Sequence, residues 1–245
     1  MRTLKLTIAY DGTRYAGWQV QRGRTRTIQG TLESVLSRIL RERVRVSGSG
    51  RTDAGVHAVA QAAHCTTRSP IARDRLLRSL NALLPPDIAV TQIEEAAHGF
   101  HARFSARRKR YRYRIYTGVV VPPFIRPYVH HVLHPLNVSA MRREAAALRG
   151  THEFRAFARL REASQNTRRT MTAVRLSRRG SELHLDIEGN GFLHTMVRSI
   201  AGTLLDVGRG RLPLGMVRRL LRTRDRRLAG TTAPACGLTL LSVEY

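Results

Sequence analysis

The first half of the chain changes regularly between two hydrophobic periods. In Thr3–Ala9 polar and apolar side chains alternate, which is the period of a strand with one buried face. Further along, apolar residues recur every three or four positions, as on the buried stripe of a helix. To residue 100 the pattern predicts these elements: a strand at Thr3–Ala9, a helix at 28–40, strands at Arg43–Ser47 and Val59–Thr66, a helix at Ala72–Leu84 and a strand at Ile88–Ile93. This is the β-α-β-β-α-β order of the ferredoxin-like fold.

The helix predicted at Ala72–Leu84 has the clearest end. Pro85 and Pro86 follow it, and proline neither continues a helix nor favours helical angles in the residue before it. Its buried stripe is expected to consist of five leucines: Leu76, Leu77, Leu80, Leu83 and Leu84. Between the two preceding strands, the glycine-rich sequence GSGRTDAG predicts a loop.

The second half repeats the order of elements with insertions. Lys109–Tyr116 alternates basic with apolar or aromatic residues, as a strand with one solvated face does. Ser139 is expected to cap a helix that runs to Leu148 and is terminated by Gly150. Arg155–Arg169 has no clear period, and we expect a mobile basic loop there. The other predicted elements are a hairpin of Val174–Ser177 and Leu183–Ile187 around Gly180, helices at Leu193–Val207 and Gly215–Leu221, and a last strand at Leu238–Val243.

Together these elements predict an α+β protein made of two ferredoxin-like (βαββαβ) halves, residues 1–100 and residues 101–245. The mainly antiparallel sheets of the two halves are expected to pack side by side. Only the order of elements repeats, because no sequence similarity between the halves is visible. Basic strands in two neighbouring halves indicate a basic cleft between them, and such a cleft suits a phosphate backbone.

The chain has a large excess of positive charge. The 245 residues include 43 Lys and Arg against 17 Asp and Glu, a formal net charge of +26. The excess is uneven, since residues 1–100 hold 15 basic and 8 acidic residues (net +7) and residues 101–245 hold 28 and 9 (net +19). A preference for Arg over Lys can reflect genome composition, but an excess of basic over acidic residues cannot. Nucleic acid is therefore the leading partner, because Lys and Arg gain affinity by releasing its counterions.

Several classes of protein are not indicated. Cys65 and Cys236 are far apart and form no Cys-x-x-Cys pair, so neither a disulfide framework nor a cysteine zinc site is expected. Asp11 comes before any signal-peptide core could form. No apolar run approaches the roughly 18 residues of a membrane span. We expect a soluble, cytoplasmic protein with no membrane partner.

The histidines at positions 130, 131 and 134 are the one grouping that suggests a metal. A zinc site usually needs further ligands in a tetrahedral arrangement, and no such set accompanies them. We therefore expect no metal and no cofactor.

The most unusual segment is GSGRTDAGVH, which contains Arg51, Asp53 and His57. It lacks the third glycine of a dinucleotide-binding fingerprint, the Gly-Lys-Ser/Thr of a phosphate-binding loop and the Gly-x-Ser-x-Gly of a nucleophile elbow. What remains is a carboxylate on a tight backbone loop. In isolation, an Asp whose side chain only caps a turn is the common explanation.

With other segments, this loop resembles the TruA family of tRNA pseudouridine synthases. The resemblance extends over essentially the whole chain, and several separated motifs in the right order make it specific. The family commonly has Phe-x-Ser-Phe where this chain has Phe154-Arg155-Ala156-Phe157, so any role of that hydroxyl is absent here. The matching stretches are Tyr10–Gln21, GSGRTDAGVHA, Asn81–Pro85, Phe100–Tyr116, Gly191–Gly208 and the closing TAPACGLTLLSVEY.

The resemblance implies an RNA-modifying isomerase that converts uridines just 3′ of the anticodon, in the anticodon stem-loop of tRNA, to pseudouridine. It also implies a homodimer and no cofactor. By the same matching, Asp53 is the catalytic carboxylate, and Arg198 pairs with it. Tyr111 stacks on the target uracil, and Arg51 helps to extrude the base and hold the opened helix.

Two of these residues also fit on physical grounds. Arg198 is the only arginine of its strongly apolar predicted helix. A lone arginine there commonly extends to solvent, but an ionised aspartate nearby would favour pairing. Tyr111 and Tyr113 share one face of their strand, and a ring is what an unstacked base needs, although core packing explains tyrosines equally well. On the other face, Arg110 and Arg112 are expected to bind the substrate.

Two other functions fit part of the sequence. A non-catalytic RNA-binding protein with ferredoxin-like modules would explain the charge and the aromatic residues, but not the Arg-Thr-Asp loop. A nuclease is disfavoured because no paired acids or histidines are placed for phosphoryl transfer.

Overall fold

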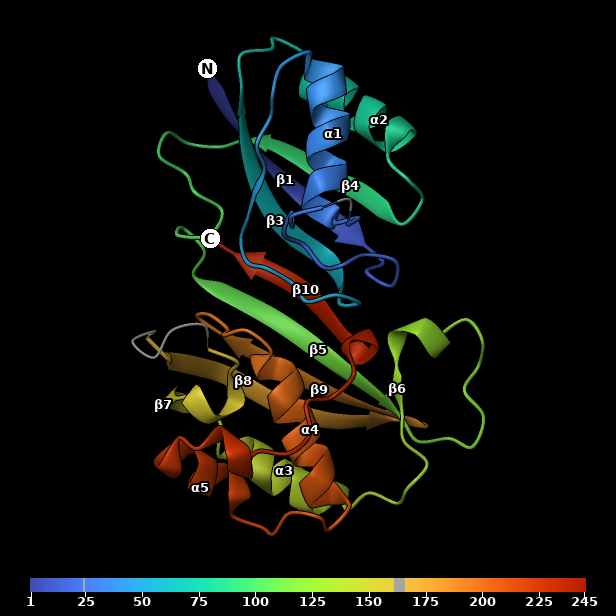
Figure 1. The fold of residues 1–245 in the computed structure, drawn as a ribbon, viewed down its shortest axis with the longest axis vertical. Helices are drawn as coiled ribbons and strands as arrows, with labels where there is room; N and C mark the ends of the chain where they lie inside the picture. Colours follow the sequence, from blue (N-terminus) through green and yellow to red (C-terminus); the bar gives the residue numbers. More distant parts are fainter. Residues whose placement is uncertain (24, 161–165) are drawn as a thin grey trace. The chain divides into compact units, whose positions relative to one another are not determined.

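The computed structural model describes residues 1–23, 25–160 and 166–245, and it divides into two compact units (Figure 1). Unit 1 consists of Met1–Arg107 together with Leu240–Tyr245, and unit 2 consists of Arg108–Thr239. Within the described ranges, no helix has the length and apolar character needed to span a membrane.

The boundary follows Arg107 rather than residue 100 because the segment between them is bound to unit 1. Ala102 is fully buried there. Its N–H donates to Nδ1 of His64 (3.2 Å), and its carbonyl accepts a hydrogen bond from the Tyr245 hydroxyl (2.9 Å). The last residues of the chain return to unit 1 because strand β10 (Leu238–Glu244) pairs with β3 (His57–Thr67).

Unit 1 has the predicted β-α-β-β-α-β order. In its sheet β4 pairs with β1 and β1 with β3, both antiparallel, and the short β2 also pairs with β3. The two helices lie side by side (Figure 1). The core is formed by leucine and isoleucine side chains of β1 and α1 that are completely buried: Leu4, Leu6, Ile8, Ile28, Leu32 and Leu36. The elements are β1 (Arg2–Tyr10), α1 (Ile28–Leu40), β2 (Ser47–Gly48), β3, α2 (Arg73–Leu83) and β4 (Ile88–Glu95).

The strand predicted at Arg43–Ser47 is wrong, because only Ser47–Gly48 pairs with β3. The two valines before it are buried but bond to α1 instead of to a strand. The N–H of Val44 donates to the Ser37 hydroxyl (3.0 Å), and the N–H of Val46 donates to a carboxylate oxygen of Glu33 (2.9 Å).

The leucine stripe of α2 is narrower than predicted. Leu76 and Leu80 are fully buried, and Leu84 is buried just beyond the end of the helix. Leu77 is partly exposed and Leu83 is exposed, so the prediction is wrong for Leu83.

Unit 2 has its sheet in the order β5-β9-β8-β7, with antiparallel pairing throughout, and a short β6 that runs parallel to β5. The predicted α+β class with mainly antiparallel sheets is confirmed in both units. The placement of the two halves side by side around a cleft stays a prediction. The elements are β5 (Arg108–Tyr116), β6 (His130–His131), α3 (Val138–Ala146), β7 (Gly150–Glu153), β8 (Arg168–Arg179), β9 (Glu182–Gly189), α4 (Met196–Gly208) and α5 (Met216–Thr223).

Two helix boundaries in unit 2 differ from prediction. The residue that caps α3 is Asn137 and not Ser139, because the Asn137 side chain accepts a hydrogen bond from the N–H of Ala140 (2.9 Å). Helix α4 begins at Met196 rather than Leu193, since Thr195 has a left-handed φ of 62° at the helix start.

The segment predicted as a basic loop, Arg155–Arg169, is only partly irregular. Arg155–Phe157 forms one turn of 3-10 helix, and Arg168 and Arg169 already belong to β8. Residues 161–165 of this segment lie outside the described residues. The hairpin of β8 and β9 is confirmed, with Gly180 at a φ of 57°.

Candidate active site

The loop that carries Asp53 is held by the segment that follows β1. The N–H of Trp18 donates to the carbonyl of Thr52 (3.0 Å). Gly17 has a φ of 93°, and a Cβ added to it would lie 2.6 Å from the same carbonyl oxygen. A Cβ on Gly12 would lie 2.0 Å from the carbonyl oxygen of Val56. Only glycine allows the two backbones to approach this closely.

Side chains before and after Asp53 in the sequence add to the contact between the Asp53 loop and the segment that follows β1. The Thr52 hydroxyl hydrogen-bonds the Tyr10 hydroxyl (2.8 Å) in a buried position. Burial raises the pKa of Tyr10 to about 12, so its hydroxyl stays protonated at neutral pH. Nδ1 of the buried His57 lies 3.2 Å from the N–H of Gly12 and 3.1 Å from the Asp11 carboxylate. The loop is thus fixed one residue before Asp53 and four residues after it.

The start of the loop is tied to β3. The N–H of Ser49 donates to the Ala62 carbonyl (2.7 Å), and the Ser49 hydroxyl donates to the side-chain oxygen of Gln61 (2.7 Å). The side-chain amide of Gln61 donates to the carbonyl of Gly50 (3.2 Å). Arg51 is exposed and Asp53 partly exposed on this buried base. The loop therefore presents a carboxylate from a backbone that needs little reorganisation.

Tyr111 and Arg198 belong to unit 2. Tyr111 lies on β5 with its ring buried and edge-on to Phe192, at 4.9 Å between ring centroids. Arg198 lies on α4, where its Nε donates to the carbonyl of Ala233 (2.8 Å) and its own carbonyl accepts from the N–H of Ala233 (3.1 Å). Its guanidinium is thereby oriented by the chain beside the helix. The ion pair with Asp53 stays a prediction.

Arg110 and Arg112 lie on the opposite face of β5 from Tyr111, as alternation along a strand requires. Arg112 makes two hydrogen bonds to Asp186 of β9, from Nε (2.8 Å) and Nη2 (3.0 Å). Arg110 lies 3.7 Å from the same carboxylate. The structure does not bring these two arginines together with Tyr111, and their binding of substrate stays a prediction.

A family model described as tRNA pseudouridine synthase matches residues 6–105 and 145–245 of this chain. The chain belongs to the tRNA pseudouridine synthase family. Three relatives named tRNA pseudouridine synthase A support this. The one from Pelobacter propionicus is 47% identical over the whole of both chains. Those from Halalkalibacterium halodurans and Bacillus subtilis are each 46% identical, covering 97% and 99% of this chain and 90% and 98% of their own.

The contacts around Asp53 show what the sequence reasoning missed in this tRNA pseudouridine synthase. Motif matching singled out the loop, but not the side chains of Tyr10 and Thr52 or the packing of Gly12 and Gly17 that hold it. The one available signal was the pair of glycines in the stretch YDGTRYAGW, since glycine is the residue that permits such close backbone approach.

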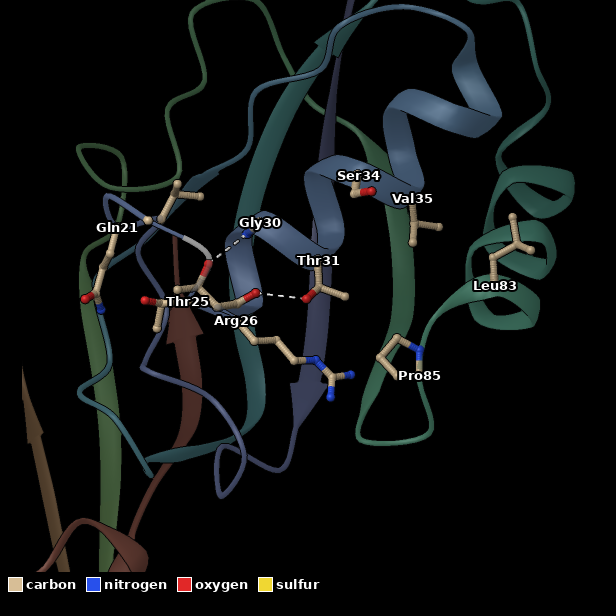
Figure 2. Close-up of a pocket in the computed structure, with 12 residues that line it drawn as sticks. Gln21, Thr25, Arg26, Gly30, Thr31, Ser34, Val35, Leu83 and Pro85 are labelled. Atoms are coloured by element: carbon tan, nitrogen blue, oxygen red, sulfur yellow. Dashed lines mark hydrogen bonds between the residues drawn. The ribbon is translucent and has the colours of Figure 1, made fainter.

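Unit 1 of the synthase also has an open hollow of about 510 Å³ beside α1 (Figure 2). It is lined by residues from the segment before α1, by the first half of α1, and by Leu83 and Pro85. The hydrogen bonds from Gly30 and Thr31 to Thr27 that close the start of α1 lie at its wall (Figure 2). None of the predicted site residues lines this hollow.

The described part of the synthase contains no group of three or more His, Cys, Asp or Glu side chains placed to hold a metal ion. Nε2 of His131 instead lies 2.8 Å from the carbonyl of Gly118, and the ring of His130 packs edge-on to Tyr113.

Proposed function

We propose that this chain isomerises uridine to pseudouridine in tRNA, with Asp53 as the catalytic carboxylate. The observation that carries the proposal is the Asp53 loop, a carboxylate held on a glycine-packed backbone within the part of the chain that matches the family. The reaction breaks the N1–C1′ bond, turns the uracil and joins C5 to C1′. The proton leaves C5 and N1 gains one, so the change is an isomerisation that consumes no donor.

The chemistry requires an ionised carboxylate close to the sugar and the edge of the base. Asp53 can act as a nucleophile, at C6 or at C1′, or as an anion that stabilises a cation-like sugar; carboxylates do both in glycoside hydrolysis, which is an analogy. Pairing with Arg198 favours the ionised form of Asp53 in either route. Within unit 2, the hydrogen bond from Nε of Arg198 to the carbonyl of Ala233 holds one edge of the guanidinium.

The target uridine has to leave its stack to reach Asp53. Flipping costs a few kcal/mol, and least where base pairing is already weak. The exposed Arg51, two residues before Asp53, helps to extrude the base and hold the opened helix. Tyr111 provides the ring against which the uracil packs, and its edge contact with Phe192 fixes that ring.

The proposed substrate is the anticodon stem-loop of tRNA, at uridines just 3′ of the anticodon. Because the substrate is tRNA, we propose that the chain acts in the cytoplasm. The chain works as a homodimer. Val119, Val120 and Phe124 of unit 2 are exposed in a single copy and are available to such an interface. Light scattering should give a molar mass of two chains, and a mass of one chain would contradict the dimer.

The function is tested by incubating the purified chain with an unmodified tRNA transcript that carries tritium at C5 of its uridines. Joining C5 to C1′ releases that hydrogen, so tritium should pass into solvent while pseudouridine appears among the separated nucleosides. A transcript with cytidine in place of the uridines just 3′ of the anticodon should release none. No release from either transcript would contradict the function, whereas equal release from both would contradict only the position.

The assay also separates the enzyme from its main rival. A non-catalytic RNA-binding protein would bind the transcript without releasing tritium. Treatment with EDTA, using prefolded tRNA and a polyamine, should leave the release unchanged, because no step of the proposed reaction uses a metal.

A further inference from the structure

The connection between β4 and β5, which can be followed in Figure 1, contains Phe104. The side chain of Phe104 is 77% exposed, although it belongs to a rigid turn rather than to a chain end. One face of its ring stacks on His101, with 4.4 Å between centroids and 30° between planes. The guanidinium carbon of Arg103 lies 5.6 Å from the ring centroid.

The turn that presents Phe104 is held by its own hydrogen bonds. The N–H of Arg103 donates to Nδ1 of His101 (3.1 Å). The N–H of His101 donates to the Ser105 hydroxyl (3.1 Å), and the N–H of Ser105 donates back to the carbonyl of His101 (2.9 Å). The buried Ala102 joins the turn to β3 and to the C-terminus through His64 and Tyr245. Because the ring is already positioned, a partner that binds it loses little conformational entropy.

The surroundings of Phe104 favour a polyanion over a protein partner. No acidic residue occurs in the sequence between Glu95 and Glu144, and Arg103 and Arg107 flank the ring. Both arginines are exposed, and among the described residues no carboxylate lies within ion-pair distance of Arg103. Aromatic rings interleaved with uncompensated cations are typical of surfaces that bind single-stranded nucleic acid, where bases stack and phosphates pair.

We propose that Phe104 is a stacking platform for an unpaired nucleobase of the RNA substrate, with Arg103 contacting an adjacent phosphate. The proposal rests on the function proposed above. His64, which anchors the turn, is seven residues along β3 from His57, which adjoins the Asp53 loop, and this is roughly 23 Å at the rise of a strand. The platform is therefore an RNA contact separate from the Asp53 loop, and it should act on affinity.

The test measures binding of unmodified tRNA to three substitutions of Phe104 across a range of salt concentrations. Phe104→Ala should raise Kd about 5- to 150-fold, the range for losing one base–aromatic stack. Phe104→Leu should stay weak because it is apolar but has no ring, whereas Phe104→Trp should restore affinity. These changes remove no charge, so the slope of log Kd against log salt should not change. Arg103→Ala should lower that slope by about one phosphate contact.

Val59→Ala is the matched control, since Val59 is also an exposed apolar residue of unit 1 and its truncation should leave Kd unchanged. Wild-type Kd for Phe104→Ala, or wild-type affinity for Phe104→Leu, would overturn the platform. A change in molar mass with unchanged Kd would overturn it in favour of a protein partner. Tritium release by the wild-type chain in the same preparation distinguishes these results from a failure of the proposed function itself.

Discussion

Asp53 and Asp186 lie in different surroundings. Asp186 is observed to pair with Arg110 and Arg112, whereas the pairing of Asp53 with an arginine is a prediction. Asp186 lies on β9 with its side chain only 15% exposed, and Arg110 and Arg112 of the neighbouring strand approach it from two positions. Four residues before it on the same strand, Glu182 receives two hydrogen bonds from Arg114 (2.9 Å each) in the same manner. Asp53 lies instead on a loop that its neighbours hold through Gly17, Thr52 and Val56.

Asp186 and Glu182 are carboxylates that hold two strands of a sheet together, whereas Asp53 is the carboxylate that we propose for the chemistry. Carboxylates of β9 largely neutralise the positive charges of the β5 arginines. The number of arginines in the β5 sequence therefore does not indicate where RNA binds. The turn at Arg103, which has no such partner in the described residues, is a better guide. A carboxylate whose loop is held by other residues can be changed without removing the contacts that place it.

Among changes that leave Asp53 itself in place, the largest expected effect comes from forcing the two backbones apart at Gly17. Gly17→Ala places a Cβ 2.6 Å from the Thr52 carbonyl oxygen, so the Asp53 loop has to shift. We expect kcat to fall about 100-fold or more, since a displacement near 1 Å has that effect on positioned groups. The measurement is tritium release at saturating tRNA.

Gly23→Ala is the matched control for Gly17. Gly23 also has a positive φ, of 90° against 93°, but a Cβ there meets nothing within 4 Å. It should cost about 1–2 kcal/mol of stability through backbone strain alone and leave kcat near the wild-type value. Equal losses of kcat in the two variants would show that strain, and not the contact with Thr52, matters.

A smaller effect is expected at Asp186. Asp186→Asn removes a charge-assisted pair of hydrogen bonds from Arg112 and should lower the free energy of unfolding by about 1.5–3 kcal/mol, with kcat unchanged. Asp225→Asn is the control, because Asp225 pairs with the highly exposed Arg227, where solvent screens the charges and the loss of the pair should leave stability nearly unchanged. Denaturant unfolding measures both. A loss of kcat without a loss of stability at Asp186 would contradict its structural role.

The smallest effect concerns acid stability. The hydrogen bonds from Arg114 lower the pKa of Glu182 from 4.5 to about 2. A depressed pKa stabilises the folded state above pH 4.5, and that stabilisation is lost as the pH falls toward 2. The wild-type chain should therefore lose more stability over this range than Glu182→Gln does. Parallel stability profiles for the two proteins would mean that Glu182 is not held in its ionised form by the sheet.

The hydrophobic period correctly predicted strands and helices whose buried residues recur at regular spacing within one segment of the sequence. Strand β1 and helix α1 are confirmed almost to the residue for this reason. The prediction from the hydrophobic period fails at residues 43–46. Val44 and Val46 alternate with polar residues and are buried, but their backbone N–H groups donate to the side chains of Ser37 and Glu33 of α1 instead of to a neighbouring strand. Alternation reports burial, and it does not say which atoms satisfy the backbone.

The candidate site was predictable only where a motif is contiguous. GSGRTDAGVH drew attention to Asp53 because the loop is unusual by itself. The hydrogen bond between Tyr10 and Thr52, and the pairing of Arg112 with Asp186, join residues 42 and 74 positions apart, and no local pattern records them. The faces of β5 followed from alternation, but whether its arginines meet RNA or carboxylates depended on β9.

The central claim is that Asp53 is the catalytic carboxylate, and Asp53→Asn tests it most directly. Asn keeps the shape and is itself a favoured turn residue, and the contacts of Gly17, Thr52 and Val56 remain. Melting and tRNA binding should therefore be retained, with binding unchanged or slightly tighter because a negative charge is lost. Nucleoside analysis and tritium release on the same preparation should show no pseudouridine. Formation of pseudouridine near the wild-type rate would contradict the account.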